Sequence, residues 1–184
     1  MRISAIGSTF CIAAWSCAVP ALAAPCDSLA ALALKDAKVT AAQVVPAGQF
    51  SPPGERSEGA GNRYRTLPAF CRVAATLTPT SDSDIKVEVW LPASGWNGKF
   101  QAVGNGGWAG EISYAAMADA VRAGYASAST DTGHVGGRGT FALGHPEKLI
   151  DFAWRSEHET AVQGKSTVAA LYGSAPRFSY FVGR

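Results

Sequence analysis

Glycine is concentrated in one stretch of this 184-residue chain, and that stretch constrains the fold more than any other feature. Ten of the 20 glycines lie in residues 104–144. Glycine adopts backbone conformations that other residues rarely reach, so a dense series of glycines indicates a chain that turns tightly or approaches a ligand closely. Apolar runs flank and interrupt the stretch, which places its turns between strands and helices.

The elements around the glycines follow an order typical of an α/β fold. The early apolar runs predict strands, two of which form an antiparallel hairpin through a turn at residues 82–84. The later strands alternate with helices, so we expect a largely parallel sheet with an antiparallel beginning and with ligands at the carboxyl ends of its strands. The expected strands are residues 39–45, 70–77, 85–91, 100–103, 125–130 and 178–182, and the expected helices are 113–121 and 156–171, with a short helix after Asp27-Ser28.

Two patterns predict exposed surfaces. In residues 85–91, apolar side chains alternate with Lys86, Glu88 and Trp90, which predicts a strand with one buried face. The run Glu157-His158-Glu159 falls on the second long helix, where adjacent residues point in different directions. This spacing favours a solvated helix face over a metal site.

The first 24 residues have the features of a secretory signal peptide. Met1 and Arg2 form a short basic start, residues 3–19 are mostly apolar, and Ala21-Leu22-Ala23 has the form of a signal peptidase site. The apolar run is too short and too often interrupted to favour a membrane-spanning helix. We therefore expect a mature chain of residues 25–184, secreted or periplasmic, with no membrane partner.

Cys26 and Cys71 are the two cysteines that remain after the expected cleavage. An even pair in an oxidising compartment predicts a disulfide, and two buried free thiols are the alternative. No Cys-x-x-Cys spacing occurs, so we expect neither a zinc site nor another metal or cofactor in this chain. The formal net charge is only +2, and without a dense basic patch we expect no nucleic-acid partner.

The loop after residues 100–103 has two functional interpretations. Gly104-x-Gly106-x-x-Ala109, with Asp131 27 residues after Gly104, resembles a dinucleotide fingerprint, although the spacing to the acid is long. Alternatively, the backbone N–H groups of this loop hold the oxyanion of a reacting ester, as in the loop after the third strand of α/β-hydrolases. An ordinary tight turn remains a third possibility.

The oxyanion interpretation depends on Asn105-Gly106-Gly107, because glycines let the backbone reach a reacting carbonyl. Trp108 follows directly and is a candidate for lining an aromatic acyl pocket. Asp131 and His134 lie three residues apart and form either an acid/base or metal pair or, as we favour, a loop in which a carboxylate holds the histidine. The chain contains no Gly-x-Ser-x-Gly, the usual nucleophile sequence of a hydrolase.

Six short motifs occur in order along the mature chain. They are residues 70–73 (FCRV), 77–85 (LTPTSDSDI), 87–92 (VEVWLP), 96–100 (WNGKF), 104–110 (GNGGWAG) and 128–134 (ASTDTGH). Together they resemble the tannase/feruloyl esterase family, from about Cys26 to Gly183. The resemblance implies a secreted serine esterase with an α/β-hydrolase core and a lid domain. Its expected substrate is a small aromatic ester, of the feruloyl or galloyl type or, in one branch, a terephthalate monoester.

The resemblance also implies roles for particular residues. Asn105-Gly106-Gly107 would carry one oxyanion donor, and Cys26 would pair with Cys71. The family continues the strand at residues 178–183 into Cys-Ser-x-Gly-Gly, whereas here Arg184 follows. We therefore expect the catalytic Ser, Asp and His, and a lid with its calcium site, to lie beyond Arg184, and we assign no catalytic residue within this chain.

The expected fold is then an incomplete α/β-hydrolase core, residues 25–184, without the lid domain. We expect an enzyme by family but an inactive chain in isolation. A non-catalytic module that binds a phenolic ligand is the alternative from another class. The strand at residues 178–182 would leave an unpaired sheet edge, so we expect the chain alone to be aggregation-prone or partly folded.

Overall fold

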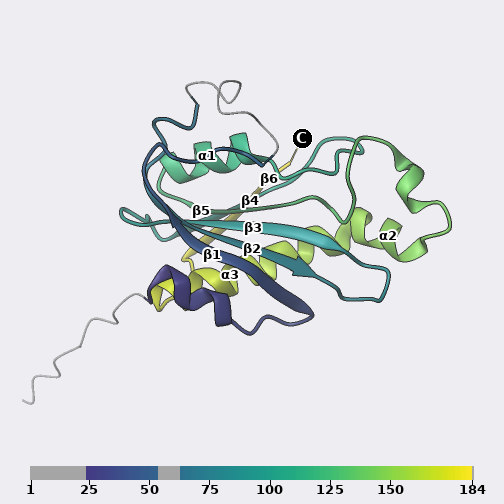
Figure 1. Cartoon of the computed structure of the whole chain (residues 1–184), viewed down its shortest axis with the longest axis horizontal. Helices are drawn as coiled ribbons and strands as arrows, with labels where there is room; N and C mark the ends of the chain where they lie inside the picture. Colours follow the sequence, from purple (N-terminus) through teal and green to yellow (C-terminus); the bar gives the residue numbers. More distant parts are fainter. Residues whose placement is uncertain (1–23, 54–62, 184) are drawn as a thin grey trace, which may run out of the picture.

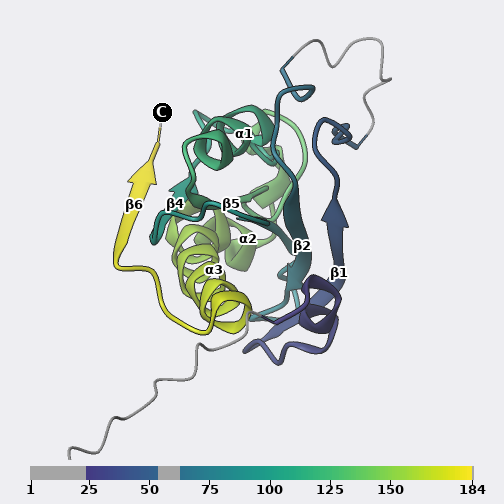
Figure 2. The ribbon, with the colours of Figure 1, turned by 90° about the vertical axis from the view of Figure 1, so that its left-hand side faces the viewer.

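The computed structural model describes residues 24–53 and 63–183. These residues form one mixed sheet with helices on both faces (Figures 1 and 2), so the expected α/β class is confirmed. The expected signal peptide, residues 1–24, lies outside the described residues apart from Ala24. Its cleavage therefore stays a prediction.

The sheet has six strands, and its parallel part is smaller than expected. The strands are β1 (Ala37–Val45), β2 (Phe70–Leu77), β3 (Ile85–Pro92), β4 (Lys99–Val103), β5 (Ala126–Thr130) and β6 (Phe178–Val182), in the spatial order β1-β2-β3-β5-β4-β6. The β2–β3 hairpin is confirmed, and β4 pairs in parallel with β5 and β6. Because β5 inserts between β3 and β4 and runs opposite to β3, three of the five pairs are antiparallel, and the expectation of a largely parallel sheet is wrong.

Two helices cover opposite faces of the sheet (Figure 2). α1 (Tyr114–Arg122) connects β4 to β5, and α3 (Ser156–Tyr172) connects β5 to β6, close to the predicted bounds of both helices. The 3₁₀ helix η1 (Cys26–Ala31) lies on the α3 side, where a short helix was expected.

Three shorter segments between β5 and α3 were not predicted. They are the 3₁₀ helix η2 (Gly139–Ala142), the helix α2 (Pro146–Ile150) and the π-helical turn η3 (Asp151–Arg155). Segments of four or five residues contain too few turns to produce a recognisable apolar period.

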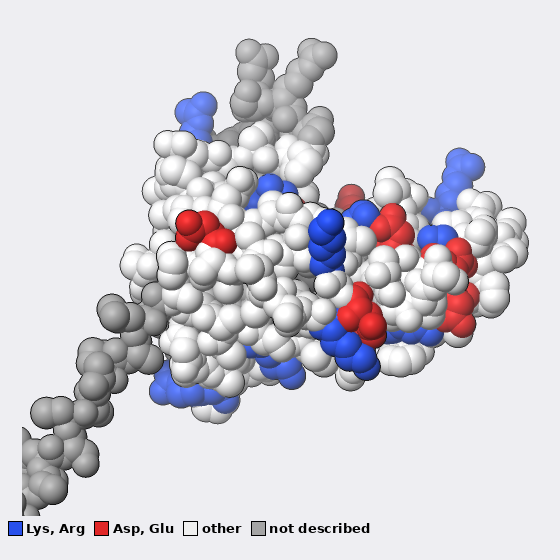
Figure 3. Space-filling view, turned by 60° about the horizontal axis from the view of Figure 1, so that its bottom comes forward, with Lys and Arg blue, Asp and Glu red and all other residues white. Residues whose placement is uncertain are grey.

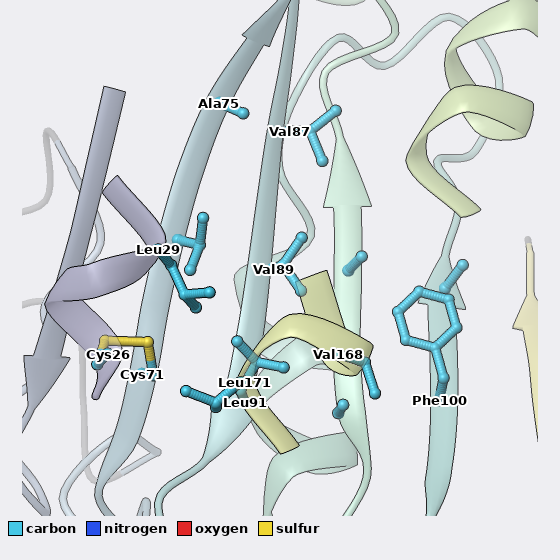
Figure 4. Close-up of a cluster of buried hydrophobic side chains, with 14 of the residues drawn as sticks. Cys26, Leu29, Cys71, Ala75, Val87, Val89, Leu91, Phe100, Val168 and Leu171 are labelled. Carbon is cyan, nitrogen blue, oxygen red and sulfur yellow. A yellow bond between two sulfur atoms is a disulfide. The ribbon is translucent and has the colours of Figure 1, made fainter. Parts of the chain in front are cut away.

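Each face of the sheet has its own apolar core. Toward α3, the sheet packs on Val168 and Leu171 (Figure 4). Toward α1, the ring of Trp90 lies 4.4 Å, centroid to centroid, from the rings of both Phe50 and Phe70. Such aromatic pairs add a directional attraction to the burial of apolar area.

Strand β3 is buried on both faces, contrary to the prediction of one buried face. Lys86 is exposed as predicted, but Trp90 is fully buried and Glu88 is only 5% exposed. The reason is that α1 and Phe50 cover the second face of the sheet. Periodicity along one strand does not show what packs on its outer side.

The predicted disulfide joins Cys26 of η1 to Cys71 of β2, with their Cα atoms 5.6 Å apart (Figure 4). The alternative of two free thiols is therefore wrong. Cys26 and Cys71 are separated by 45 residues, so the bond closes a long loop around β1 and the first edge of the sheet.

Charged side chains are sparse and mixed on the face that Figure 3 shows, where basic and acidic groups are scattered over larger uncharged areas. Within residues 24–53 and 63–183, no helix is both long and apolar enough to cross a membrane.

Strand β6 forms the second edge of the sheet, and all of its residues are exposed, including Phe178 and Phe181 at 57% and 59%.

Breaking the disulfide should destabilise the fold. We expect reduction, or a double change of Cys26→Ala and Cys71→Ala, to lower the free energy of unfolding by about 2–4 kcal/mol, because the unfolded chain gains loop entropy. Urea unfolding at low protein concentration, with and without reductant, measures this difference. An unchanged midpoint on reduction would contradict it.

The open edge of β6 should promote association of the isolated chain. We expect Phe178→Lys to delay aggregation on heating, because a lysine on an edge strand opposes pairing with another strand. Leu143→Lys is the matched control, since Leu143 is 75% exposed but lies outside the sheet. Static light scattering during a thermal ramp compares the variants; reversible unfolding of the unaltered chain as a monomer would refute the expectation.

Candidate active site

A cavity of about 620 Å³ lies at the edge of the sheet where β4 and β6 end. The residues that line it come from the segment after β1, the segment before β2, the β4–α1 loop, the first turn of α1 and the end of β6. They are Pro52, Pro53, Tyr64, Val103, Gly104, Asn105, Gly106, Ala109, Glu111, Ile112, Ser113, Tyr114, Ala115, Ala116 and Val182. Two residues of the predicted oxyanion loop, Asn105 and Gly106, are therefore at the cavity.

Asn105 holds the β4–α1 loop in place through its side chain. Its Nδ2 donates to the carbonyl oxygen of Thr130 at 2.9 Å, and its Oδ1 accepts from Ser113 Oγ at 3.1 Å. The backbone N–H of Ser113 in turn donates to Ser129 Oγ at 3.0 Å. The loop is thus fixed at one side to the end of β5 and at the other to the start of α1.

Glycine is favoured at two positions of this loop. Gly107 has a φ of 55°, in the left-handed region that favours glycine. A Cβ on Gly104 would lie 2.6 Å from the Phe181 ring and 3.3 Å from Glu157 Oε1, so a side chain there would displace the exposed Phe181 ring. These constraints explain part of the glycine pattern from which the sequence prediction started.

The loop presents backbone donors that the fold does not use. Within the described part of the chain, the N–H groups of Asn105, Gly106 and Gly107 donate no hydrogen bond to another residue. Gly104 N, by contrast, donates to the carbonyl oxygen of Val182 at 3.0 Å and extends the β4–β6 ladder. The end of β6 therefore lies beside these free N–H groups, which can stabilise negative charge on a ligand oxygen.

Trp108 and Gly107 are not among the residues that line the cavity. Trp108 stacks on Phe152, with ring centroids 4.6 Å apart, and remains 45% exposed. Its role in lining an aromatic pocket stays a prediction. The dinucleotide hypothesis is not supported, because α1 begins only at Tyr114 and the glycines do not open a helix as a pyrophosphate site requires.

His134 is not held by a carboxylate, and this expectation is wrong. Its Nε2 donates to the carbonyl oxygen of Trp108 at 2.9 Å, and its Nδ1 lies 3.2 Å from Thr132 Oγ1. Asp131 Oδ1 instead accepts from the backbone N–H groups of Lys86 and Gly133, and burial raises the pKa of its carboxyl. Asp131 and His134 thus brace the loop after β5 and do not form an acid/base pair.

Metal binding finds no support in this part of the protein. Residues 24–53 and 63–183 contain no group of three His, Cys, Asp or Glu side chains placed to hold a metal ion. The calcium site that the resemblance implies is expected in a lid beyond Arg184, so it stays a prediction, and no step is derived through it.

Two side chains of the cavity wall, Tyr114 and Glu111, were not predicted from the sequence. Tyr114 Oη donates to Glu88 Oε1 at 3.0 Å, and Trp90 Nε1 donates to Glu88 Oε2 at 2.8 Å. Arg72 pairs with both oxygens of the same carboxylate. A buried charge of this kind is tolerated because it is paired and hydrogen-bonded, and here it fixes Tyr114 in the wall. The alternation that suggested an exposed Glu88 gave no sign of this network.

Glu157 is not on a solvated helix face, contrary to prediction. Its side chain is half-buried against Gly104, and its Oε2 is buried without a hydrogen-bond partner in the described residues. Burial raises the pKa of this carboxyl to about 7. The folded-state pKa thus lies above that of an unfolded glutamate, so the protonated form is favoured next to the candidate site.

Glu157 should make stability fall as pH rises. Its contribution is complete below the unfolded-state pKa near 4.5 and is lost as pH rises through about 7. We expect the chain to be about 1–2 kcal/mol less stable at pH 8 than at pH 5 from this group, after allowance for partial exposure. Urea unfolding at both pH values should show a smaller difference in Glu157→Gln. Glu159→Gln is the control, and an equal difference in the unaltered chain and Glu157→Gln would contradict the assignment.

The amino-acid sequence is similar to those of known esterases. A family model described as tannase and feruloyl esterase matches residues 71–184. An uncharacterised esterase of Xanthomonas campestris is 42% identical over 162 residues, which cover 87% of this chain and 27% of that protein. A probable feruloyl esterase B-1 of Aspergillus fumigatus is 40% identical over 114 residues, 62% of this chain and 21% of that protein.

A solved structure gives the same result. The crystal structure of feruloyl esterase B from Aspergillus oryzae superposes with a TM-score of 0.74 at 34% identity, over 86% of this chain and 31% of that one. The chain thus spans less than a third of the length of these relatives. The family match, over more than half of the chain, and the shared fold show that this protein belongs to the tannase and feruloyl esterase family.

Proposed function

We propose that this chain supplies the oxyanion side of a serine esterase that hydrolyses small aromatic-acid esters, of the feruloyl or galloyl type. The observation that carries the proposal is the free N–H groups of residues 105–107, a loop in which Asn105 and Gly106 line the cavity. The β4–β6 pairing supports it, because β6 ends next to this loop. The known relatives named as esterases support the reaction class.

In the proposed mechanism, a serine beyond β6 attacks the ester carbonyl and a histidine from the remaining polypeptide takes its proton. The carbonyl oxygen becomes negatively charged, and N–H groups of residues 105–107 donate hydrogen bonds to it. These groups are fixed before the reaction by the Asn105 side chain, so little reorganisation is needed. The nucleophile, the acid and the base are not assigned to any residue of this chain.

Residues 25–184 are, in this proposal, an incomplete α/β-hydrolase core that lacks the lid domain. The isolated chain is then inactive toward esters. The Cys26–Cys71 disulfide supports a secreted or periplasmic protein, because disulfides persist mainly in oxidising compartments.

The direct test joins residues 25–183 to the remaining part of the Xanthomonas campestris esterase. We expect the fusion, but not the isolated chain, to hydrolyse methyl ferulate or methyl gallate, and a serine-directed inhibitor to stop it. Asn105→Ala in the fusion should lower kcat roughly tenfold or more with a smaller change in KM, since the loop donors lose their support.

Ser28→Ala is the matched control, because Ser28 is exposed on η1 and bonds only to Pro25. Circular dichroism verifies that each fusion is folded. Hydrolysis by the isolated chain, or a folded fusion whose rate is unaffected by Asn105→Ala, would contradict the proposal. A folded fusion that binds the esters without cleaving them would favour the phenolic-ligand binding module instead.

A further inference from the structure

The polar side chains of the cavity wall are mostly committed to the protein itself. Asn105 bonds to Thr130 and Ser113, and Ser113 Oγ donates back to Asn105. The Tyr114 hydroxyl donates to Glu88 at 3.0 Å. Tyr114 therefore offers a ligand its ring, its hydroxyl proton being donated to Glu88, and the neighbouring wall adds the apolar side chains of Pro52 and Ile112.

Glu111 is different from these side chains. It lines the cavity, its side chain is exposed, and it makes no hydrogen bond or ion pair with another described residue. The lining residues that the structure describes include no Lys, Arg or His, so Glu111 is the one charged side chain in this set. A carboxylate accepts hydrogen bonds and repels another carboxylate.

We propose that Glu111 is the specificity-determining residue of this cavity and selects neutral aromatic esters that carry a hydroxyl group over esters that carry a second, ionised carboxyl group. The inference rests on the proposed function for the ester, and on the wall composition for the selection. The ring packs on Tyr114 and Ile112, and its hydroxyl donates to Glu111. A carboxylate in the same place meets the charge of Glu111, and no cation among the described lining residues offsets it.

Two probes of the same size test this inference on residues 25–184, at a protein concentration low enough that light scattering shows a monomer and circular dichroism shows a folded chain. Methyl 4-hydroxybenzoate carries a neutral para hydroxyl at pH 7, and monomethyl terephthalate carries a para carboxylate. We expect the first probe to shift the backbone amide NMR signals of residues 111–116 and to bind roughly fivefold or more tightly than the second. Because the discrimination is a repulsion between exposed charges, about 1 M salt should reduce it.

Glu111→Gln should bring the two affinities within about twofold of each other by removing the repulsion. Glu159→Gln makes the same change of charge on α3, away from the cavity, and should leave the preference intact. Equal affinities in the unaltered chain, shifts confined to another surface, or a preference that survives both Glu111→Gln and high salt would each overturn the inference. The salt series needs no variant, so it decides the matter even if Glu111→Gln fails to fold.

The outcome is separable from that of the proposed function. Selective binding together with an inactive, folded fusion would refute the esterase but keep the role of Glu111. An active fusion whose isolated N-terminal chain binds both probes equally would refute the role of Glu111 and keep the esterase.

Discussion

The parallel pairing of β4 with both β5 and β6 is the constraint on which the candidate site depends. It brings the carboxyl ends of β4, β5 and β6 to the same end of the sheet. The β4–α1 loop, the loop after β5 and the exit of β6 consequently meet there, although they are far apart in sequence. Gly104 is the contact point, since its N–H pairs with β6 and its missing side chain leaves room for Phe181 and Glu157.

Two sets of polar contacts stabilise this edge without using the groups proposed to act on a substrate. Asn105 is bonded through its side chain to β5 and α1, which leaves the backbone N–H groups of the loop free. The Glu88 carboxylate accepts hydrogen bonds from Arg72, Trp90 and Tyr114, and the bond to Tyr114 fixes one wall of the cavity. Both sets exist in the fold before any ligand binds, which is the property an oxyanion site requires.

Sequence patterns predicted the elements of this fold better than their environment. All six strands, α1, α3 and the disulfide were predicted, because apolar period and cysteine pairing are local or compositional signals. The burial of Glu88 and Glu157 was not predicted, because it depends on elements distant in sequence. Tyr114 of α1 packs against Glu88, and Glu157 lies against Gly104 beside Phe181 of β6. Asn105 and Gly106 were predicted as site residues from the order of the motifs. Glu111 and Tyr114 carry no such motif, and only the three-dimensional structure shows that they line the cavity.

The central claim is that backbone N–H groups of residues 105–107 hold the oxyanion of an ester attacked by a serine beyond β6. The most direct measurement is a crystal structure of the fused esterase inhibited by an aromatic phosphonate, whose phosphonyl oxygen stands in for the oxyanion. We expect that oxygen to lie within about 3 Å of the backbone nitrogen of Asn105, Gly106 or Gly107. A phosphonyl oxygen bound only by donors from elsewhere in the protein would contradict it.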